Sequence, residues 1–511
     1  MSRTSKSIRN VIVAALGQVL VILAGFVARK IFVIFLADEY LGVNGLFTSV
    51  LTVLSLAELG VGPAIIFSLY KPLAENNIPV CQALMRIFKR AYLAIGTVVL
   101  AAGLAITPFI TVFIKEVPDS IQGIHWIYVL FVLNTAISYF YSYKRSLITA
   151  SQNHYWIDGV HTAAYIIMNV LQIGVLALTS NYFLFLGLQI ASTLTENVIL
   201  SRKADREFPW LKEKSDAKLP DGVRREIVRN IKAMVLHRIG GIAVDSTDNL
   251  LISKFFGLLF LGLYSNYLLI FSAVKSVTGS FFSSITASIG NFGAQESPEK
   301  ANDLYRKVQF INSWMAAFCG ISLFVLMNPF VETLWLGRDY LLSTGILLVL
   351  VINFYLNTMR KTVLTFKEAY GLPWHDRYKP VAAALVNLTT SIILAKKLGV
   401  IGVFLGTTIT ELFVNIWVEG YVVFKHCLHR SLGEFLKLFT SQVCVFLLCG
   451  VVTVGVSSCM ATGIAFLDFV LKCLTCLVIP NALYVLIYWR TKEFGALRQI
   501  FSGIMSRMKK G

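Results

Sequence analysis

The chain has 511 residues, of which 56% are apolar and 14% are charged, and its mean hydropathy is +0.70. A water-soluble fold of this composition would expose large apolar patches and aggregate, so soluble enzymes, disordered chains and disulfide-built secreted proteins are excluded. The net charge of +18 would suggest nucleic acid as a partner of a soluble chain, but the cytoplasmic loops of membrane proteins also collect Lys and Arg. We therefore predict a polytopic membrane protein that does not bind nucleic acid.

Apolar stretches of about 20 residues, enough to cross a bilayer, predict fourteen transmembrane helices. The first eight begin near Val11, Leu41, Ala91, Ile121, Trp156, Asn181, Ala233 and Gly257. The other six begin near Val308, Leu341, Val381, Leu398, Leu438 and Ile464, and the last ends near Trp489. The first stretch follows basic residues as a secretory signal does, but it continues without a cleavage site and is expected to remain as a span. The predicted fold class is an all-α integral membrane protein.

Most of the 46 Lys and Arg residues fall in the N-terminal tail, in every second connecting segment and in the C-terminal tail. Positively charged loops stay on the cytoplasmic side of a membrane. Both termini are therefore predicted to be cytoplasmic. The opposite loops are short, so function is expected to lie within the membrane.

The longest polar segment, 202–232, predicts a cytoplasmic linker between two six-helix bundles, 1–201 and 233–424. Two additional helices (425–489) and a basic amphipathic tail (490–511) follow. The tail is expected to lie on the membrane surface, and a partner-binding helix is the alternative. A shift of 220 positions places Leu41-Gly42-Val43 on Leu261-Gly262-Leu263, which suggests that the bundles repeat, a common architecture in transporters.

Two cations lie deep in the first predicted span. Arg29 and Lys30 are roughly 10 Å from its outer end at the rise of an α-helix. Ionisable residues at this depth either line a wet cavity or extend to the interface. We favour the cavity for Arg29 and the interface for Lys30, and both are candidate substrate-binding residues.

The seventh predicted span carries Arg238, Asp245 and Asp248, which helical spacing can place on one face. A basic cavity suits an anionic ligand, and arginine donates paired hydrogen bonds to phosphate or pyrophosphate oxygens. Arg238 is therefore a third candidate substrate-binding residue. Asp245 and Asp248 would balance Arg238 or bind a coupling proton or sodium ion. The alternative is a ladder of salt bridges between helices.

Glu58 is a further candidate for ion coupling because the string Ser55-Leu-Ala-Glu-Leu-Gly-Val-Gly-Pro63 combines a carboxylate with a helix break that exposes backbone carbonyls. A structural pair is the alternative for Glu58. The remaining ionisable residues in or near spans are expected to pair or to reach the interface; they include Glu196, Glu411 and Glu419.

Motifs for catalysis, cofactors and metals are missing from the sequence. It contains no GxxxxGK[ST], HExxH or GxSxG string, so neither an enzyme nor a Walker-type ATPase is expected. Cys473 and Cys476 form a CxxC inside an apolar stretch without a second ligand pair, so no metal or redox site is expected there. A coupling proton or sodium ion is left open, and no other cofactor is expected.

Several strings resemble the bacterial polysaccharide transporters, which are the Wzx-like oligosaccharide flippases of the MATE and MOP superfamily. The similarity extends over about residues 8 to 425. In the first half it rests on Tyr40-Leu-Gly-Val-Asn-Gly-Leu-Phe47, Leu56-Ala-Glu-Leu-Gly-Val-Gly62 and Leu69-Tyr-Lys-Pro-Leu-Ala-Glu-Asn76. In the second half it rests on Ser246-Thr-Asp-Asn249, Gly262-Leu-Tyr-Ser-Asn-Tyr267, Arg377-Tyr-Lys-Pro380 and Leu398-Gly-Val-Ile-Gly-Val-Phe-Leu-Gly406.

The resemblance implies two six-helix bundles around a V-shaped, cation-lined cavity, usually with fourteen spans. It implies a multi-pass protein of the bacterial cell membrane that turns an undecaprenyl-pyrophosphate-linked oligosaccharide from the cytoplasmic to the outer leaflet by alternating access, for capsule, exopolysaccharide or another wall polymer. Arg29 and Arg238 fall on the spans where the family places arginines for the pyrophosphate. Membrane lipids, a polysaccharide polymerase and glycosyltransferases are the other partners that it suggests.

The sequence departs from the family's pattern after Tyr378-Lys-Pro380. Relatives often carry a carboxylate there, whereas this chain reads Val381-Ala-Ala-Ala-Leu385, so ion coupling through that span is not expected. Two other functions stay open: a cation-coupled multidrug exporter of the same superfamily, and a scaffold for polysaccharide assembly without transport. An exporter of organic cations would need a cavity richer in carboxylates and aromatic rings.

Overall fold

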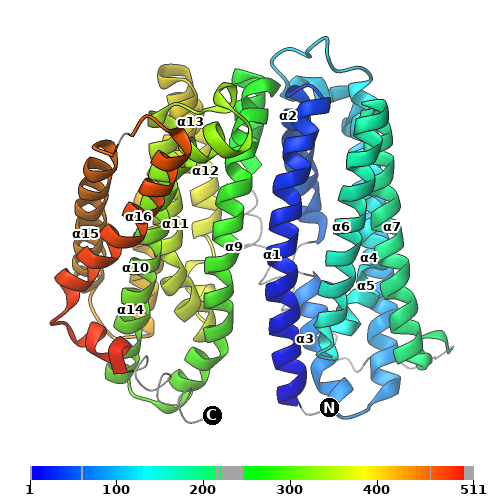
Figure 1. Ribbon diagram of the computed structural model, residues 1–511. Helices are drawn as coiled ribbons and strands as arrows, with labels where there is room; N and C mark the ends of the chain where they lie inside the picture. The colour runs from blue at the N-terminus through cyan, green and yellow to red at the C-terminus, as the bar shows by residue number, and fades with distance from the viewer. Residues whose placement is uncertain (1–2, 59–60, 214–218, 220–245, 461, 500–511) are drawn as a thin grey trace. The chain divides into compact units, whose positions relative to one another are not determined.

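The computed structural model describes residues 3–58, 61–213, 219, 246–460 and 462–499 (Figure 1). These residues form helices and connecting loops without β-strands, which confirms the predicted all-α class. The chain divides into two compact units, Met1–Ser265 and Asn266–Gly511, called unit 1 and unit 2 below.

Unit 1 is a helix bundle in which α1 packs along α6 (Figure 1). It also includes the helical residues 246–256 and the start of α9 (Leu258–Gln295). Its other helices are α1 (Arg3–Phe35), α2 (Glu39–Leu54), α3 (Val61–Ala74), α4 (Ile78–Ile106), α5 (Ile124–Ala150), α6 (His154–Thr179) and α7 (Tyr182–Glu207). Three 3₁₀ segments join them: η1 (Ser55–Glu58), η2 (Thr107–Phe113) and η3 (Pro209–Lys212).

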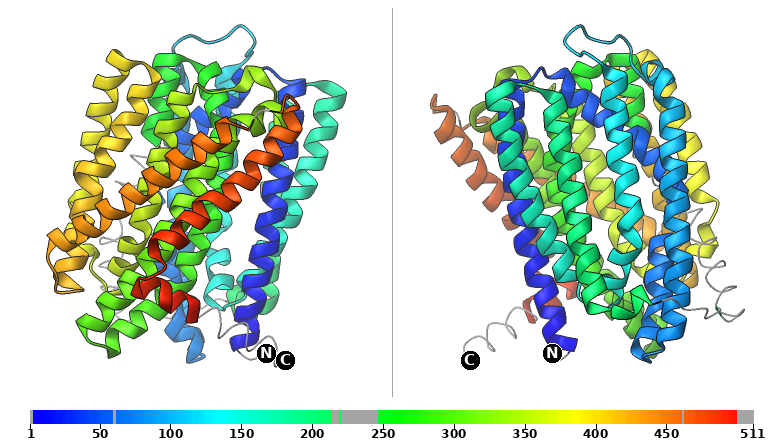
Figure 2. Two further views of the ribbon diagram at one scale, coloured as in Figure 1. Left: turned by 60° about the vertical axis from the view of Figure 1, so that its left-hand side comes forward. Right: turned by 90° about the vertical axis from the view of Figure 1, so that its right-hand side faces the viewer.

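Unit 2 contains the rest of α9 and seven more α-helices. These are α10 (Pro298–Phe330), α11 (Thr344–Ala369), α12 (Lys379–Leu398), α13 (Val400–Thr410), α14 (Ile416–His426), α15 (Leu432–Ser458) and α16 (Ala465–Tyr488). The π-helical segment η7 (Glu411–Asn415) joins α13 to α14 without a break. In Figure 2 (left), α15 and α16 run side by side at an incline to the other helices of this unit. A short helix over residues 492–499 follows α16.

Twelve helices of the described chain are long and apolar enough to cross a membrane. The second predicted span is also present, but as two shorter apolar helices, α2 and α3, with η1 between them. Most of the seventh predicted span precedes residue 246 and lies outside the described residues. The chain is thus a multi-pass membrane protein, and the described helices account for the predicted spans other than the seventh.

The helix starts follow ordinary capping rules. The side chain of Asn77 accepts a hydrogen bond from the Val80 amide at the start of α4, and Asn181 accepts from two amides at the start of α7. Proline occupies the first turn of α4, α10 and α12, where its missing N–H costs nothing. These caps matter because a helix end inside or near the bilayer has few other partners for its backbone groups.

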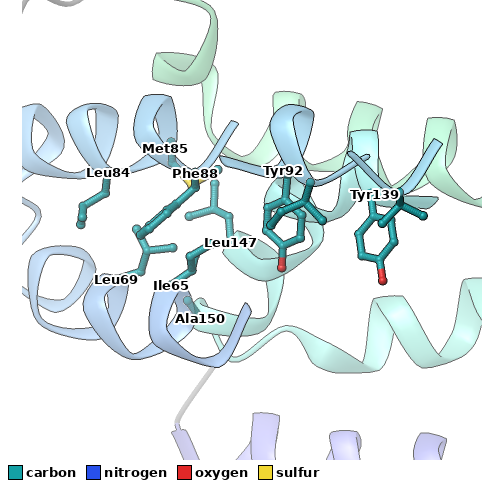
Figure 3. Packing of buried hydrophobic residues seen from close by; sticks show 11 residues of the cluster. Ile65, Leu69, Leu84, Met85, Phe88, Tyr92, Tyr139, Leu147 and Ala150 are labelled. Carbon is teal, nitrogen blue, oxygen red and sulfur yellow. The ribbon is translucent and has the colours of Figure 1, made fainter. Parts of the chain in front are cut away.

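One apolar cluster of unit 1 joins α3, α4 and α5 (Figure 3). Leu69 on α3, Phe88 on α4 and Leu147 on α5 are each at most 1% exposed. Tyr92 continues the cluster along α4, and its hydroxyl donates to Glu58 Oε1 over 3.3 Å. The cluster therefore fixes α3 against α4, and Tyr92 of α4 contacts Glu58 in the break that precedes α3.

A backbone crossing in unit 1 depends on the two Leu-Gly strings that the shift of 220 aligned. A Cβ at Gly42 on α2 would lie 2.0 Å from the carbonyl oxygen of Leu258. A Cβ at Gly262 on α9 would lie 2.5 Å from the carbonyl oxygen of Asp38. Only residues without a side chain allow α2 and α9 to approach this closely.

We expect Gly42→Val to separate α2 from α9, because the obstacle is backbone and cannot rotate away. Overpacking a core site typically lowers the free energy of unfolding by about 1–3 kcal/mol or more. The melting temperature of the purified protein should therefore fall by more than about 5 °C. Gly45→Val is the matched control on the same helix, since its Cβ would meet only the flexible Leu261 side chain at 3.5 Å or more. Equal melting temperatures for the two variants would contradict the crossing.

Candidate functional site

Arg29 projects from α1 toward the start of α9 within unit 1. Its Nη1 atom donates a hydrogen bond to Ser265 Oγ over 3.0 Å, and that hydroxyl donates in turn to the Gly262 carbonyl over 2.7 Å. Arg29 is half-buried, whereas its neighbour Lys30 is exposed. The guanidinium therefore keeps most of its donors available beside a polar hydroxyl.

Two tyrosines are electrostatic neighbours of the Arg29 guanidinium. The phenols of Tyr165 on α6 and Tyr182 on α7 are the ionisable groups that act on it most strongly. Tyr182 is fixed because its hydroxyl donates to Asn44 Oδ1 over 2.9 Å and its ring packs at 4.4 Å from the ring of Tyr40. We call Arg29, Tyr165, Tyr182 and Ser265 the arginine site.

The arginine site has no counter-charge within the part of the chain that the structure describes: no carboxylate there lies within ion-pair distance of Arg29. A cation at membrane depth without a partner is costly, so its retention points to a ligand. Its donors and the phenol hydroxyls suit an oxyanion with several acceptor oxygens.

Apart from Lys30, the other sequence-predicted site residues that the structure describes lie on elements other than α1. Arg238 and Asp245 lie outside the described residues. Asp248 belongs to the helical residues 246–256 and is engaged in a polar or electrostatic interaction. Glu58 is the last residue of η1 and accepts a hydrogen bond from the Tyr92 hydroxyl. A Cβ on Gly62 would come within 3.2 Å of the Glu58 carboxylate, so the glycine provides the room that this side chain occupies.

Unit 2 contains a dense charge cluster that was not singled out from the sequence. Arg360 on α11 donates through Nη1 to both oxygens of Glu411, at 2.7 and 2.6 Å, and through Nε and Nη2 to Glu419, at 2.9 and 2.8 Å. Lys379 on α12 also contacts Glu419, and the Asn415 amide donates to Glu411. The four charged side chains are at most 11% exposed. Two cations and two carboxylates balance, so this cluster is closed to a further ion.

The pairing expected for acidic residues in spans is confirmed for Glu196, Glu411 and Glu419. Arg360 was not predicted as a site residue because the polar residues around it are typical of the end of a span. The available signal was the presence of two carboxylates two spans further along the chain, because buried carboxylates need a partner. Tyr165 and Tyr182 gave no sequence signal, since tyrosine is common in spans.

Unit 2 also has an apolar groove between α9, α10 and α16. Its volume is about 800 Å³, and side chains such as Phe281, Ile289 and Ile311 line it. At one end Trp314 donates from Nε1 to Asn481 Oδ1 over 2.7 Å, and Leu497 of the segment after α16 borders the groove. The lining could hold a hydrocarbon chain but offers almost no partner to a charged molecule.

The residues that the structure describes contain no group of three or more His, Cys, Asp or Glu side chains placed to hold a metal ion. Cys473 and Cys476 both carry free thiols, the first partly and the second fully buried. The chemical resources of the chain are therefore hydrogen bonding, charge and apolar surface.

No protein-family model and no curated protein sequence matches this chain. Solved structures do match. "Lipid II flippase MurJ, inward closed conformation" aligns with 94% of this chain and 99% of its own at a TM-score of 0.65 and 13% identity. An inward-facing multidrug resistance MATE family transporter of the MOP superfamily aligns with 79% of this chain and 94% of its own, at a TM-score of 0.59 and 16% identity. A mutant of the Vibrio cholerae MATE transporter VcmN aligns with 84% of this chain and 99% of its own, at a TM-score of 0.57 and 11% identity. At these identities the likeness establishes the fold, which is that of MATE transporters and MurJ.

Proposed function

We propose that this protein is a flippase for a lipid-linked oligosaccharide, with undecaprenyl pyrophosphate as the carrier, moved from the cytoplasmic to the outer leaflet of a bacterial cell membrane. It would serve the synthesis of capsule, exopolysaccharide or another wall polymer, beside a polymerase and glycosyltransferases. The fold supports this function, since one of its structural neighbours is a lipid II flippase.

The observation that carries the proposal is the guanidinium of Arg29, which has a neutral hydroxyl and no carboxylate as its partner among the described residues. An exporter of organic cations would be expected to present carboxylates at such a site, and within the described chain the arginine site has none. Pyrophosphate would satisfy the donors of Arg29 and of the Tyr165 phenol, whereas the Tyr182 hydroxyl donates to Asn44. Arg238, Lys30 and the coupling candidates Asp245, Asp248 and Glu58 keep their proposed roles. A coupling proton or sodium ion stays part of the proposal.

The apolar groove of unit 2 has the kind of lining that a polyprenyl chain requires. Its lining is aliphatic and aromatic, and its volume of about 800 Å³ is in the range of sites that enclose sizeable ligands. We assign it to the polyprenyl chain, since an uncharged chain gains free energy from every apolar contact removed from water or headgroups.

The test is deletion of the gene followed by measurement of undecaprenyl-pyrophosphate-linked oligosaccharide in each leaflet. We expect the lipid-linked sugar to accumulate on the cytoplasmic leaflet while surface polymer is lost, and the intact gene to reverse both effects. Unchanged lipid-linked sugar together with new sensitivity to cationic drugs would instead identify a multidrug exporter. If surface polymer were normal when Arg29 is replaced but lost when the gene is deleted, the protein would act as a scaffold without transport.

A further inference from the structure

In unit 1 a nearly buried carboxylate is shared by basic groups from two other helices. Arg145 Nη2 of α5 lies 2.9 Å from Glu196 Oε1, and His161 Nδ1 of α6 lies 3.0 Å from Glu196 Oε2. The Glu196 side chain is 12% exposed, whereas that of His161 is 50% exposed. The half-exposed imidazole of His161 can therefore exchange protons with its surroundings, whereas the nearly buried carboxylate of Glu196 beside it cannot easily do so.

Unit 2 carries a related but closed arrangement on α11 and η7. Arg145 and Glu196 are separated by 51 residues, as are Arg360 and Glu411, and both residues of the second pair follow those of the first by 215 positions. Glu411 is satisfied by the Arg360 guanidinium and by an amide. Arginine and lysine stay charged at all physiological pH values, whereas histidine changes charge between pH 5 and 8. Only the cluster in unit 1 has a described histidine in contact with its carboxylate.

The histidine is connected to the arginine site through one tyrosine. Tyr165 lies one turn after His161 on α6, and the two rings are 6.2 Å apart. The Tyr165 phenol acts on Arg29, and its oxygen lies 3.3 Å from the position of a Cβ on Gly25, one turn before Arg29 on α1. His161 and Arg29 therefore flank the same side chain.

The other charged groups near this cluster are already partnered. On α6, His154 pairs with Asp158 at 3.5 Å. Lys144 of α5 contacts Asp205 of α7 at 2.7 Å and Ser201. On α1, Arg29 is the charged group that faces Tyr165. The charge of the Arg145, His161 and Glu196 cluster thus changes from zero to +1 when His161 takes up a proton, without a nearby unpaired described group to absorb the change.

We propose that His161, held by Glu196 and Arg145, is a proton-binding site that sets the affinity of the arginine site for an anionic headgroup. This inference rests on the proposed function of the arginine site. A positive imidazolium beside Tyr165 raises the electrostatic potential at Arg29, so the affinity for a phosphate-bearing headgroup rises as the pH falls through the titration range of histidine. Because binding couplings are reciprocal, headgroup binding must increase proton binding at His161 by the same factor.

The first measurement is the Kd of undecaprenyl pyrophosphate for the full-length protein in lipid nanodiscs at pH 8 and pH 6. We expect binding about fivefold tighter at pH 6, the size of a unit charge acting over roughly 10 Å at a partly screened protein site. His161→Gln should remove this difference while keeping a hydrogen bond to Glu196. His154→Gln, on the same helix, should retain it. Titration of the probe itself is common to all three proteins and cancels in the comparison.

The second measurement needs no ligand. Imidazole nitrogen resonances of the histidine-labelled protein are recorded from pH 5 to 8, and the His161 signal is identified by its loss in His161→Gln. It should titrate in this range, and Glu196→Gln should lower the protonated fraction at a given pH because the stabilising carboxylate charge is gone.

The two measurements separate the possible failures. Absence of probe binding at both pH values, with His161 titrating under the control of Glu196, would overturn the headgroup function and the coupling while leaving the proton site in place. A His161 signal that ignores pH, or a pH dependence of binding that survives in His161→Gln, would overturn the proton site itself.

Discussion

Replacing Arg29 by glutamine is expected to reduce flipping of the lipid-linked oligosaccharide by about 100-fold. The guanidinium would make two charge-assisted hydrogen bonds to the pyrophosphate, each contributing about 1.5 kcal/mol, and glutamine offers neither the charge nor the paired donors. Arg29→Lys should also lose most of the activity, since a single ammonium cannot reproduce the planar fork. The measurement is the rate at which a fluorescent lipid-linked oligosaccharide becomes accessible to a quencher outside proteoliposomes.

The stability of the same variant distinguishes a ligand-binding arginine from a structural one. Arg29 has one neutral hydrogen-bond partner, Ser265, and no described carboxylate to leave behind. Its removal should therefore leave the melting temperature unchanged or raise it, because an uncompensated charge at depth costs free energy. Lys71→Gln on α3 is the control, because its side chain is 84% exposed and outside the arginine site, and it should retain most of the activity. Loss of activity together with a lower melting temperature in Arg29→Gln would indicate a packing role instead.

The fold could be predicted from hydropathy to a large extent, because a bilayer allows the backbone few arrangements besides helices of sufficient length. The second span shows where this fails. Its apolar composition predicts one crossing from Leu41, but η1 interrupts it at Glu58. The carboxylate and the glycines around it indicated a break in this stretch, whereas the position of the break depends on the contacts of Tyr92 and Gly62.

The candidate site was predictable only in part. Arg29 stood out because a cation interrupts an apolar stretch, which a single sequence reveals. Its tyrosine neighbours come from α6 and α7, more than 130 residues away in sequence, and tertiary packing alone brings them together. The same limit applies to Arg360, whose role depends on carboxylates about 50 to 60 residues further along the chain.

Arg360→Gln should destabilise unit 2 more than any other single change considered above. It leaves Glu411 nearly buried at 6% exposure with an amide as its remaining described partner, while Glu419 keeps Lys379. Removing one member of a buried ion pair typically costs about 3–5 kcal/mol, because the other charge stays desolvated. Thermal unfolding is measured by the reaction of buried thiols, such as those of Cys427 and Cys449, with a thiol-reactive dye.

The double variant Arg360→Gln with Glu411→Gln decides whether charge imbalance is the cause. It removes both members of one pair and leaves the Lys379–Glu419 pair intact, so unit 2 should recover most of the lost stability. Arg338→Gln is the control for an exposed pair. Its partner Glu332 is 45% exposed and 3.8 Å away, and such surface pairs contribute about 0–1 kcal/mol. If the double variant were as unstable as the single one, Arg360 would act through its shape and packing, and the balanced charges of the cluster would not explain why it is closed to ions.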